Sequence, residues 1–78
     1  MDISYFIEKF ATQFDNIDFK VLKSDTKFRQ LDNWSSVTAL LIISMIDDKY
    51  EVIISGEDIV NSTTIQDLFD IVNTKKGD

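Results

Sequence analysis

The amino-acid sequence predicts an all-α fold, a bundle of three longer helices and one short helix with a long connection after the first. Apolar residues recur at spacings of three and four in separate segments, which is the period of an amphipathic helix. Helix-start signals precede the later segments, and the one strand-like run, residues 52–54, is too short to count. A chain of 78 residues has the size of one domain, so we expect residues 1–78 to share one modest core.

The first helix is expected over residues 3–14, followed by a long connection. Its apolar stripe consists of Ile3, Phe6, Ile7, Phe10 and Phe14. Aromatic residues at this spacing are typical of core packing. Asp15 and Asn16 break the pattern, and residues 15–34 show no sustained period. Because a connection of this length has to be held down, we expect apolar residues to fix it across the helices, with one helical turn near residues 27–31. These apolar residues are Val21, Leu22, Phe28 and Leu31.

The strongest helix signal covers residues 36–50. Fifteen residues without a turn signal favour a helix, although several β-branched residues leave a strand arguable on propensity alone. Ser35 and Ser36 stand directly before the apolar run, where a serine oxygen can cap free backbone N–H groups. We expect Ile43 to be fully buried. The whole core stripe of this helix should consist of Val37, Ala39, Leu40, Ile42, Ile43, Ile46 and Tyr50.

Two further helices are expected near the C-terminus. Residues 55–58 match a capping box, which opens a helix of one or two turns ending at Val60. Residues 61–63 form a break, and Thr64 and Asp67 repeat the capping pattern before the last helix. The stripe of that helix consists of Ile65, Leu68, Phe69 and Val72. The final Lys75-Lys76-Gly77 supplies the positive charge and the glycine that a helix C-terminus favours.

The composition argues against an enzyme and points to basic partners. The chain has no cysteine and no histidine, and its two glycines cannot form a phosphate-binding loop. A net charge of −6 predicts repulsion from nucleic acids and anionic membranes, and attraction to surfaces rich in Lys and Arg. No apolar run approaches the roughly 20 residues of a membrane span, and the N-terminus lacks the pattern of a signal peptide. We therefore expect a cytoplasmic monomer.

Acidic residues concentrate between residues 30 and 70, where eight acids accompany one lysine. A charge run of this kind fits a plain solvated surface as well as it fits a docking face for basic partners. Leu41 is expected to be exposed on the part of the second helix that the core stripe leaves open. An apolar centre with a charged rim is a common design of protein interfaces.

Several stretches carry a resemblance to a known family. The start of the second helix reads Asp32-Asn33-Trp34-Ser35-Ser36-Val37-Thr38-Ala39-Leu40, and residues 45–50 end that helix with two acids before an aromatic residue. Residues 52–59 and 63–68 lead into the two later helices. Together these stretches resemble the acyl carrier proteins. That family has four helices, a long first loop and an Asp-Ser-Leu motif at the start of helix two. The chain is most similar to stand-alone members with a Trp two residues before the modified serine. It departs from the motif where Ser35 replaces the Asp and Val37 replaces the Leu.

The resemblance implies that Ser36 carries a covalent 4′-phosphopantetheine, attached from coenzyme A by a phosphopantetheinyl transferase that uses Mg²⁺. Ser36 fits better than Ser35 because an apolar residue follows it directly and because it lies 14 positions before Tyr50. A helix N-terminus also favours a bound anion. The implied protein is not itself an enzyme. It would hold an acyl cargo as a thioester and present it to acyl-loading and acyl-processing enzymes, as in fatty acid biosynthesis. Aminoacyl, polyketide and saccharide-tailoring cargoes stay open.

Residues around Ser36 also have expected roles, and a tryptophan more often packs than binds a ligand. Trp34 should lock the connection beside Ser36. The candidate residues for partner docking are Asp32, Val37, Leu41, Asp47, Asp48 and Glu57. The alternative is a helical, acidic interaction module without a prosthetic group, or a degenerate carrier that lost its function with the change at Ser35. A third class, an acid-pair hydrolase, would need Asp47 or Asp48 in a cleft.

Overall fold

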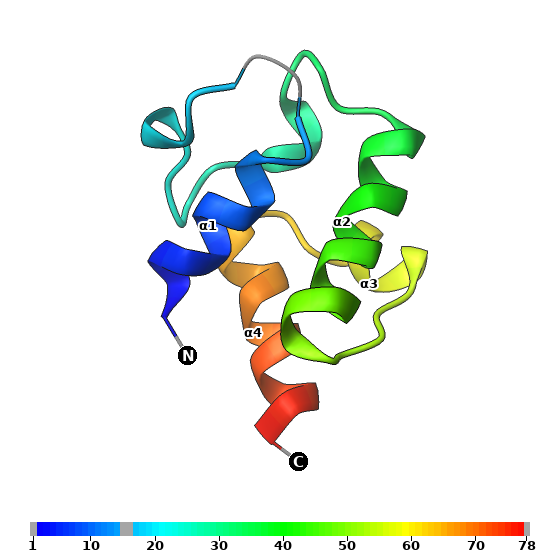
Figure 1. The fold of residues 1–78 in the computed structure, drawn as a ribbon. Helices are drawn as coiled ribbons and strands as arrows, with labels where there is room; N and C mark the ends of the chain where they lie inside the picture. The colour runs from blue at the N-terminus through cyan, green and yellow to red at the C-terminus, as the bar shows by residue number, and fades with distance from the viewer. Residues whose placement is uncertain (1, 15–16, 78) are drawn as a thin grey trace.

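The computed structural model describes residues 2–14 and 17–77. These residues form four α-helices: α1 (Ile3–Ala11), α2 (Ser36–Tyr50), α3 (Gly56–Val60) and α4 (Ile65–Gly77). Two single 3₁₀ turns, η1 (Phe19–Val21) and η2 (Phe28–Gln30), lie in the connection between α1 and α2. The described part of the chain contains no strand, so the all-α prediction is confirmed. Figure 1 shows α1, α2 and α4 as the long elements, with α3 beside α2.

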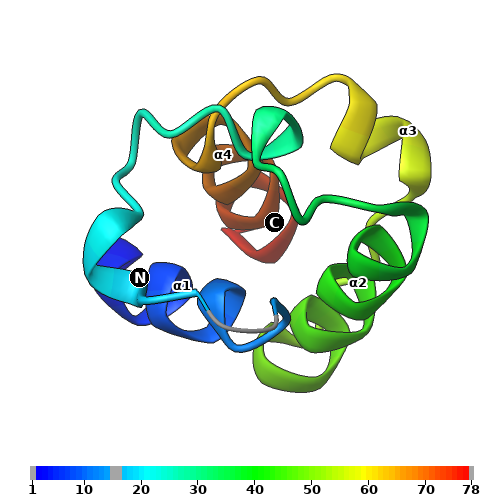
Figure 2. The ribbon, with the colours of Figure 1, turned by 90° about the horizontal axis from the view of Figure 1, so that it is seen from above.

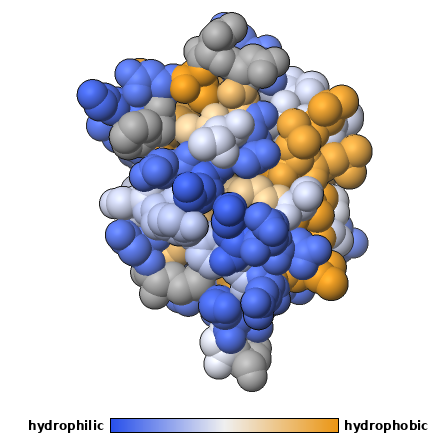
Figure 3. Space-filling model, in the orientation of Figure 1, coloured by the Kyte–Doolittle hydropathy of each residue, from blue (hydrophilic) through white to orange (hydrophobic). Residues whose placement is uncertain are grey.

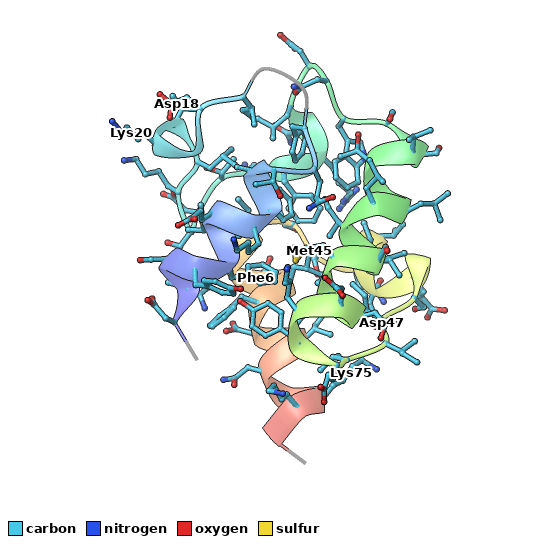
Figure 4. The ribbon with its side chains drawn as sticks, viewed as in Figure 1. Phe6, Asp18, Lys20, Met45, Asp47 and Lys75 are labelled. Atoms are coloured by element: carbon cyan, nitrogen blue, oxygen red, sulfur yellow. The ribbon has the colours of Figure 1, made fainter. Side chains whose placement is uncertain are left out.

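The core lies between α1, α2 and α4 and is closed by the connection. Its fully buried apolar side chains are those of Phe6, Phe10, Phe28, Ile42, Ile46, Ile65, Leu68 and Val72. Figure 4 shows Phe6 of α1 and Met45 of α2 in the space between their helices. Aromatic contacts link α1 to the connection, since the rings of Phe10 and Phe28 are 5.4 Å apart between centroids. These contacts place the connection on the same hydrophobic cluster as the helices.

Helix α1 is shorter than predicted. Asp2 caps its start, where its carboxylate accepts a hydrogen bond of 2.9 Å from the N–H of Ser4. The expected end at Phe14 is wrong, because the helix ends at Ala11. The Thr12 hydroxyl donates to the carbonyl of Lys9 at 2.7 Å, and the Gln13 amide donates to the same oxygen at 3.1 Å. These side chains occupy the acceptor that the next turn of the helix would use. Phe14 is nevertheless buried.

The buried face of α2 differs from the predicted stripe. Ile42, Ile46 and Tyr50 are buried as expected, but Val37 and Leu40 are 64% and 66% exposed. Thr38 and Met45 are buried in their place. Ile43 and Ala39 are half-buried, so the expectation of a fully buried Ile43 is also wrong. The core face of α2 is therefore rotated away from Val37 and Leu40 at the N-terminal end of the helix.

The connection is fixed to the start of α4. The backbone N–H of Ile65 donates to the carbonyl of Thr26 at 3.1 Å, and the N–H of Gln66 donates to the carbonyl of Ser24 at 2.8 Å. Figure 2 shows the connection passing across the end of α4 before it reaches α2. Leu22 and Phe28 are buried and Leu31 packs against the core, as predicted, whereas Val21 is 64% exposed. The predicted turn near residues 27–31 is confirmed as η2. The predicted break at Asp15 and Asn16 lies outside the described residues.

Both predicted capping patterns are present at the later helices. Ser55 and Asp58 form a reciprocal capping box at the start of α3. At the start of α4 the N–H groups of Thr64 and Thr63 donate to the Asp67 carboxylate at 3.1 and 3.0 Å. These hydrogen bonds, that from Thr64 first, hold the pKa of Asp67 below its usual range. The caps satisfy backbone N–H groups that helices of this length leave free.

No helix in the described part of the chain has the length and apolar character needed to cross a membrane.

Candidate functional site

Ser35 and Ser36 differ sharply in their bonding although they are adjacent. Ser35 is the N-cap of α2, and its Oγ accepts a hydrogen bond of 3.2 Å from the N–H of Thr38. The Ser35 and Thr38 hydroxyls also hydrogen-bond to each other at 3.1 Å, and Thr38 donates to the carbonyl of Asn33 at 3.4 Å. Ser36 is the first residue of the helix and is exposed. Its side chain forms none of the hydrogen bonds found among the described residues. The hydroxyl of Ser36 is therefore open to a partner molecule.

Ser36 stands at the edge of an open groove between α2 and α3. The groove has a volume of about 370 Å³, and its lining is mostly apolar. It is lined by Arg29, Trp34, Ser36, Ala39, Leu40, Gly56, Ile59 and Val60. Ser36 and Leu40 come from α2, whereas Ile59 and Val60 come from α3. The shape of the groove therefore depends on how these two helices are held together.

Trp34 fixes the segment that leads into α2. Its indole packs against the ring of Phe28, with centroids 5.2 Å apart, and against Phe14 at 6.2 Å. The backbone N–H of Trp34 also donates a hydrogen bond to the carbonyl of Leu31 at 3.0 Å. The prediction that Trp34 holds the connection next to Ser36 is confirmed. The segment that leads into α2 is thus packed against the aromatic core.

Four of the candidate docking residues lie in two groups along α2, whereas Asp32 precedes that helix and Glu57 lies on α3. Val37 and Leu41 lie within two turns of Ser36 and are 64% and 44% exposed, so the expected exposure of Leu41 is confirmed. Figure 3 shows hydrophobic side chains on the flank where Figure 1 draws α2 and α3. Asp47 and Asp48 lie at the other end of α2, about 17 to 18 Å along the axis from Ser36 at about 1.5 Å per residue. Asp32, Asp47, Asp48 and Glu57 are all exposed.

The carboxylates do not converge on one site. Asp47 and Asp48 are neighbours on a helix, so their side chains leave the axis about 100° apart. Asp48 borders a polar groove of about 300 Å³ and lies 3.5 Å from the ammonium of Lys49. The described residues contain no group of three acidic side chains that could hold a metal ion. The arrangement therefore offers separate exposed charges rather than a paired acid and base.

Arg29 is a site residue that the sequence did not indicate. It lies in η2, yet it lines the groove beside Ser36. It hydrogen-bonds to two carbonyl groups at the end of α3, those of Val60 and Ser62. These acceptors lie 31 and 33 residues further along the chain, and no local pattern connects them to Arg29. Only the folded chain brings them together.

Comparisons of the chain with protein-family models, with curated proteins and with solved structures find no match.

Proposed function

We propose that this protein is an acyl-carrier-type protein, modified on Ser36 with 4′-phosphopantetheine, and that its bundle is of the acyl-carrier kind. The observation that carries the proposal is the difference in bonding and exposure between two adjacent serines. Ser35 is engaged in capping α2, whereas the Ser36 hydroxyl is exposed on the first residue of a helix of 15 residues. The resemblance of residues 31–72 to the acyl carrier proteins supports the same assignment.

The residues around Ser36 fit the proposed prosthetic group. A phosphodiester on Ser36 would lie at the N-terminus of α2, where the helix dipole and free N–H groups stabilise an anion. Trp34 and the Ser35 cap hold that end of the helix in place. When bound, the group supplies a thiol that forms thioesters, which the chain cannot supply because it has no cysteine. In this reading, the role of the protein is to hold and present its cargo, and partner enzymes do the chemistry.

The exposed face of α2 provides the proposed docking surface. Val37 and Leu41 form an apolar centre beside Ser36, and the exposed acids are Asp32, four residues before Ser36, and Glu57 on α3. Such a surface is complementary to an apolar patch rimmed by Lys and Arg, as expected of the transferase and of the acyl-loading and acyl-processing enzymes. The site lies in a protein whose acids outnumber its bases by six. A location in the cytoplasm, where coenzyme A is present, is part of this proposal.

The test is modification of the purified chain by a phosphopantetheinyl transferase with coenzyme A and Mg²⁺. We expect the intact mass to rise by one phosphopantetheine and peptide mapping to place it on Ser36. Ser36→Ala should abolish the mass increase, and Ser35→Ala, the matched control, should keep it. Ser35→Asp restores the acid found in the family motif and tests a transferase that requires it. Modification of neither the natural chain nor Ser35→Asp, or modification of Ser35, would show the proposal to be wrong.

The same exposed apolar and acidic face favours a second candidate, an interaction module without a prosthetic group. That candidate predicts binding to basic partners that is unaffected by Ser36→Ala. A pull-down with the natural chain and with Ser36→Ala, both unmodified, separates it from the carrier proposal. Loss of binding in Leu41→Ala would identify the apolar centre as the contact.

A further inference from the structure

The short helix α3 places one side chain in the core and makes polar contacts near both of its ends. It has five residues, and Ile59 is its one buried side chain, whereas Val60 is 63% exposed. A single turn of helix is not stable alone, and its last carbonyl groups lack partners within the helix. The segment after it, through Ser62, is turned back by hydrogen bonds to Asp58 and Ile59. The position of α3 therefore depends on groups from elsewhere in the chain.

Arg29 provides the contact at the C-terminal end of α3. Its Nε donates to the carbonyl of Ser62 at 3.1 Å, and its Nη2 donates to the carbonyls of Val60 and Ser62, each at 3.0 Å. A cation at a helix C-terminus also interacts favourably with the helix dipole. The contact at the other end is weaker in geometry, since the Lys75 ammonium lies 3.8 Å from the Asp58 carboxylate. The planar guanidinium, with donors in a fixed fork, fixes direction as well as distance.

Arg29 also lines the groove beside Ser36. One wall of this groove belongs to α2 and the other to α3, and Arg29 links the second wall to the connection that carries Trp34. A protein that approaches Ser36 meets exposed side chains of both helices, Leu40 on α2 and Val60 on α3. The relative position of these two side chains is part of any surface that such a partner recognises.

We propose that Arg29 is a positioning residue that holds α3 against α2 and thereby sets the surface through which a partner protein reaches Ser36. The part concerning the partner rests on the proposed function. Arg29 acts through α3 and is not required to touch the prosthetic group. Its loss should loosen α3 locally, leave the core between α1, α2 and α4 intact, and weaken partner docking without changing the reactivity of the Ser36 hydroxyl.

The first arm of the experiment is amide hydrogen exchange on the unmodified chain. Arg29→Ala should speed exchange in residues 57–62 about tenfold or more, because hydrogen bonds to a charged group are lost. Amides of α1 and α4 should keep their rates. Lys27→Ala is the matched control: it removes the same charge two residues away, from an exposed side chain. Arg29→Lys should fall between, since lysine keeps the charge but lacks the fork.

The second arm measures the modification of Ser36 by the transferase. Arg29→Ala should raise the KM for the carrier about threefold to tenfold with kcat unchanged, which is the pattern of weakened docking. A uniform rise of exchange over the whole chain, or rates equal to those of Lys27→Ala, would overturn the positioning role. An unchanged KM despite a loosened α3 would overturn the link to the partner. If the natural chain is never modified, the proposed function and that link are refuted, and the exchange arm still decides whether Arg29 holds α3.

Discussion

At the scale of single residues, the start of α2 shows how two identical side chains acquire different roles. Ser35 has extended backbone, with φ of −153° and ψ of 172°, so its hydroxyl points back at the first turn and accepts from the N–H of Thr38. Ser36 already belongs to the helix, and its side chain is directed to solvent. The buried hydroxyl of Thr38 completes the cap by bonding to Ser35 and to the Asn33 carbonyl. Capping and chemical availability are thus divided between neighbours.

This difference predicts different effects on stability. Ser35→Ala should lower the free energy of unfolding by about 1 kcal/mol, because it removes an N-cap acceptor. In a domain of this size that corresponds to a fall in Tm of about 4–8 °C. Ser36→Ala should change Tm by much less, since its hydroxyl supports no hydrogen bond of the described chain. Thermal melts of the two unmodified variants give the comparison, and equal shifts would contradict the assignment of the cap to Ser35.

The cap at Ser35 could be predicted from local sequence signals, whereas the contacts between distant parts of the chain could not. A serine directly before an apolar run indicates an N-cap, because the capping oxygen and the N–H group that donates to it are only three residues apart. Arg29 gave no such signal, because its acceptors at Val60 and Ser62 are brought close only by the folding of the whole chain. The connection is similar: Thr26 and Ser24 bond to the start of α4 through backbone atoms, which no side-chain pattern records.

At the scale of elements, α2 shows where the spacing of apolar residues fails to predict which helix face is buried. Its first half is apolar on nearly every side, so spacing alone does not choose the face that is buried. Packing against α1, α3 and α4 makes the choice, burying Thr38 and leaving Leu40 exposed. The buried face of α4, which has one clear apolar stripe, was predicted correctly. Its buried residues are Ile65, Leu68, Phe69 and Val72. The end of α1 was missed because side-chain bonds to the Lys9 carbonyl compete with the helix.

The observed face of α2 leads to a paired prediction. Ile46 is fully buried, so Ile46→Ala should lower the free energy of unfolding by about 2–5 kcal/mol. Ile43 is half-buried, and Ile43→Ala should cost clearly less than Ile46→Ala. Because small domains have about 5 kcal/mol of stability, the Ile46 variant should be close to unfolded at ambient temperature. Urea titrations followed by circular dichroism measure both values, and the reverse order would show the helix face to be wrong.

At the scale of the whole molecule, charge is distributed unevenly over the fold. Seven of the eight acids of residues 30–70 fall on α2, α3, α4 and the segments between them. The described part of the connection after α1 carries the acids Asp18, Asp25 and Asp32 together with the bases Lys20, Lys23, Lys27 and Arg29. Figure 4 shows Asp47 and Lys20 at opposite sides of the molecule. Such a separation orients an approaching basic protein before contact is made. Ser36 lies on α2, the helix that also carries Asp47 and Asp48.

Charge reversal on α2 tests this orientation. Replacing Asp47 and Asp48 together by Lys should slow association with the transferase by up to about fivefold for each exposed pair lost. The loss should shrink as salt is raised, because charges further apart than about 10 Å are screened at 0.1 M salt. Modification rates of the natural and reversed chains at low and high salt provide the measurement. Equal rates at low salt would leave docking to the apolar side chains Val37 and Leu41.

The single tryptophan of the chain has a use of another kind. Trp34 sits where the connection meets the core, with its ring against Phe28 and Phe14. Its fluorescence therefore reports the docking of the connection, whereas circular dichroism reports the helices. With no proline in the chain, refolding has no slow phase from isomerisation of prolyl bonds. The two optical signals together can time the arrival of the connection against the formation of the helices, with no added label.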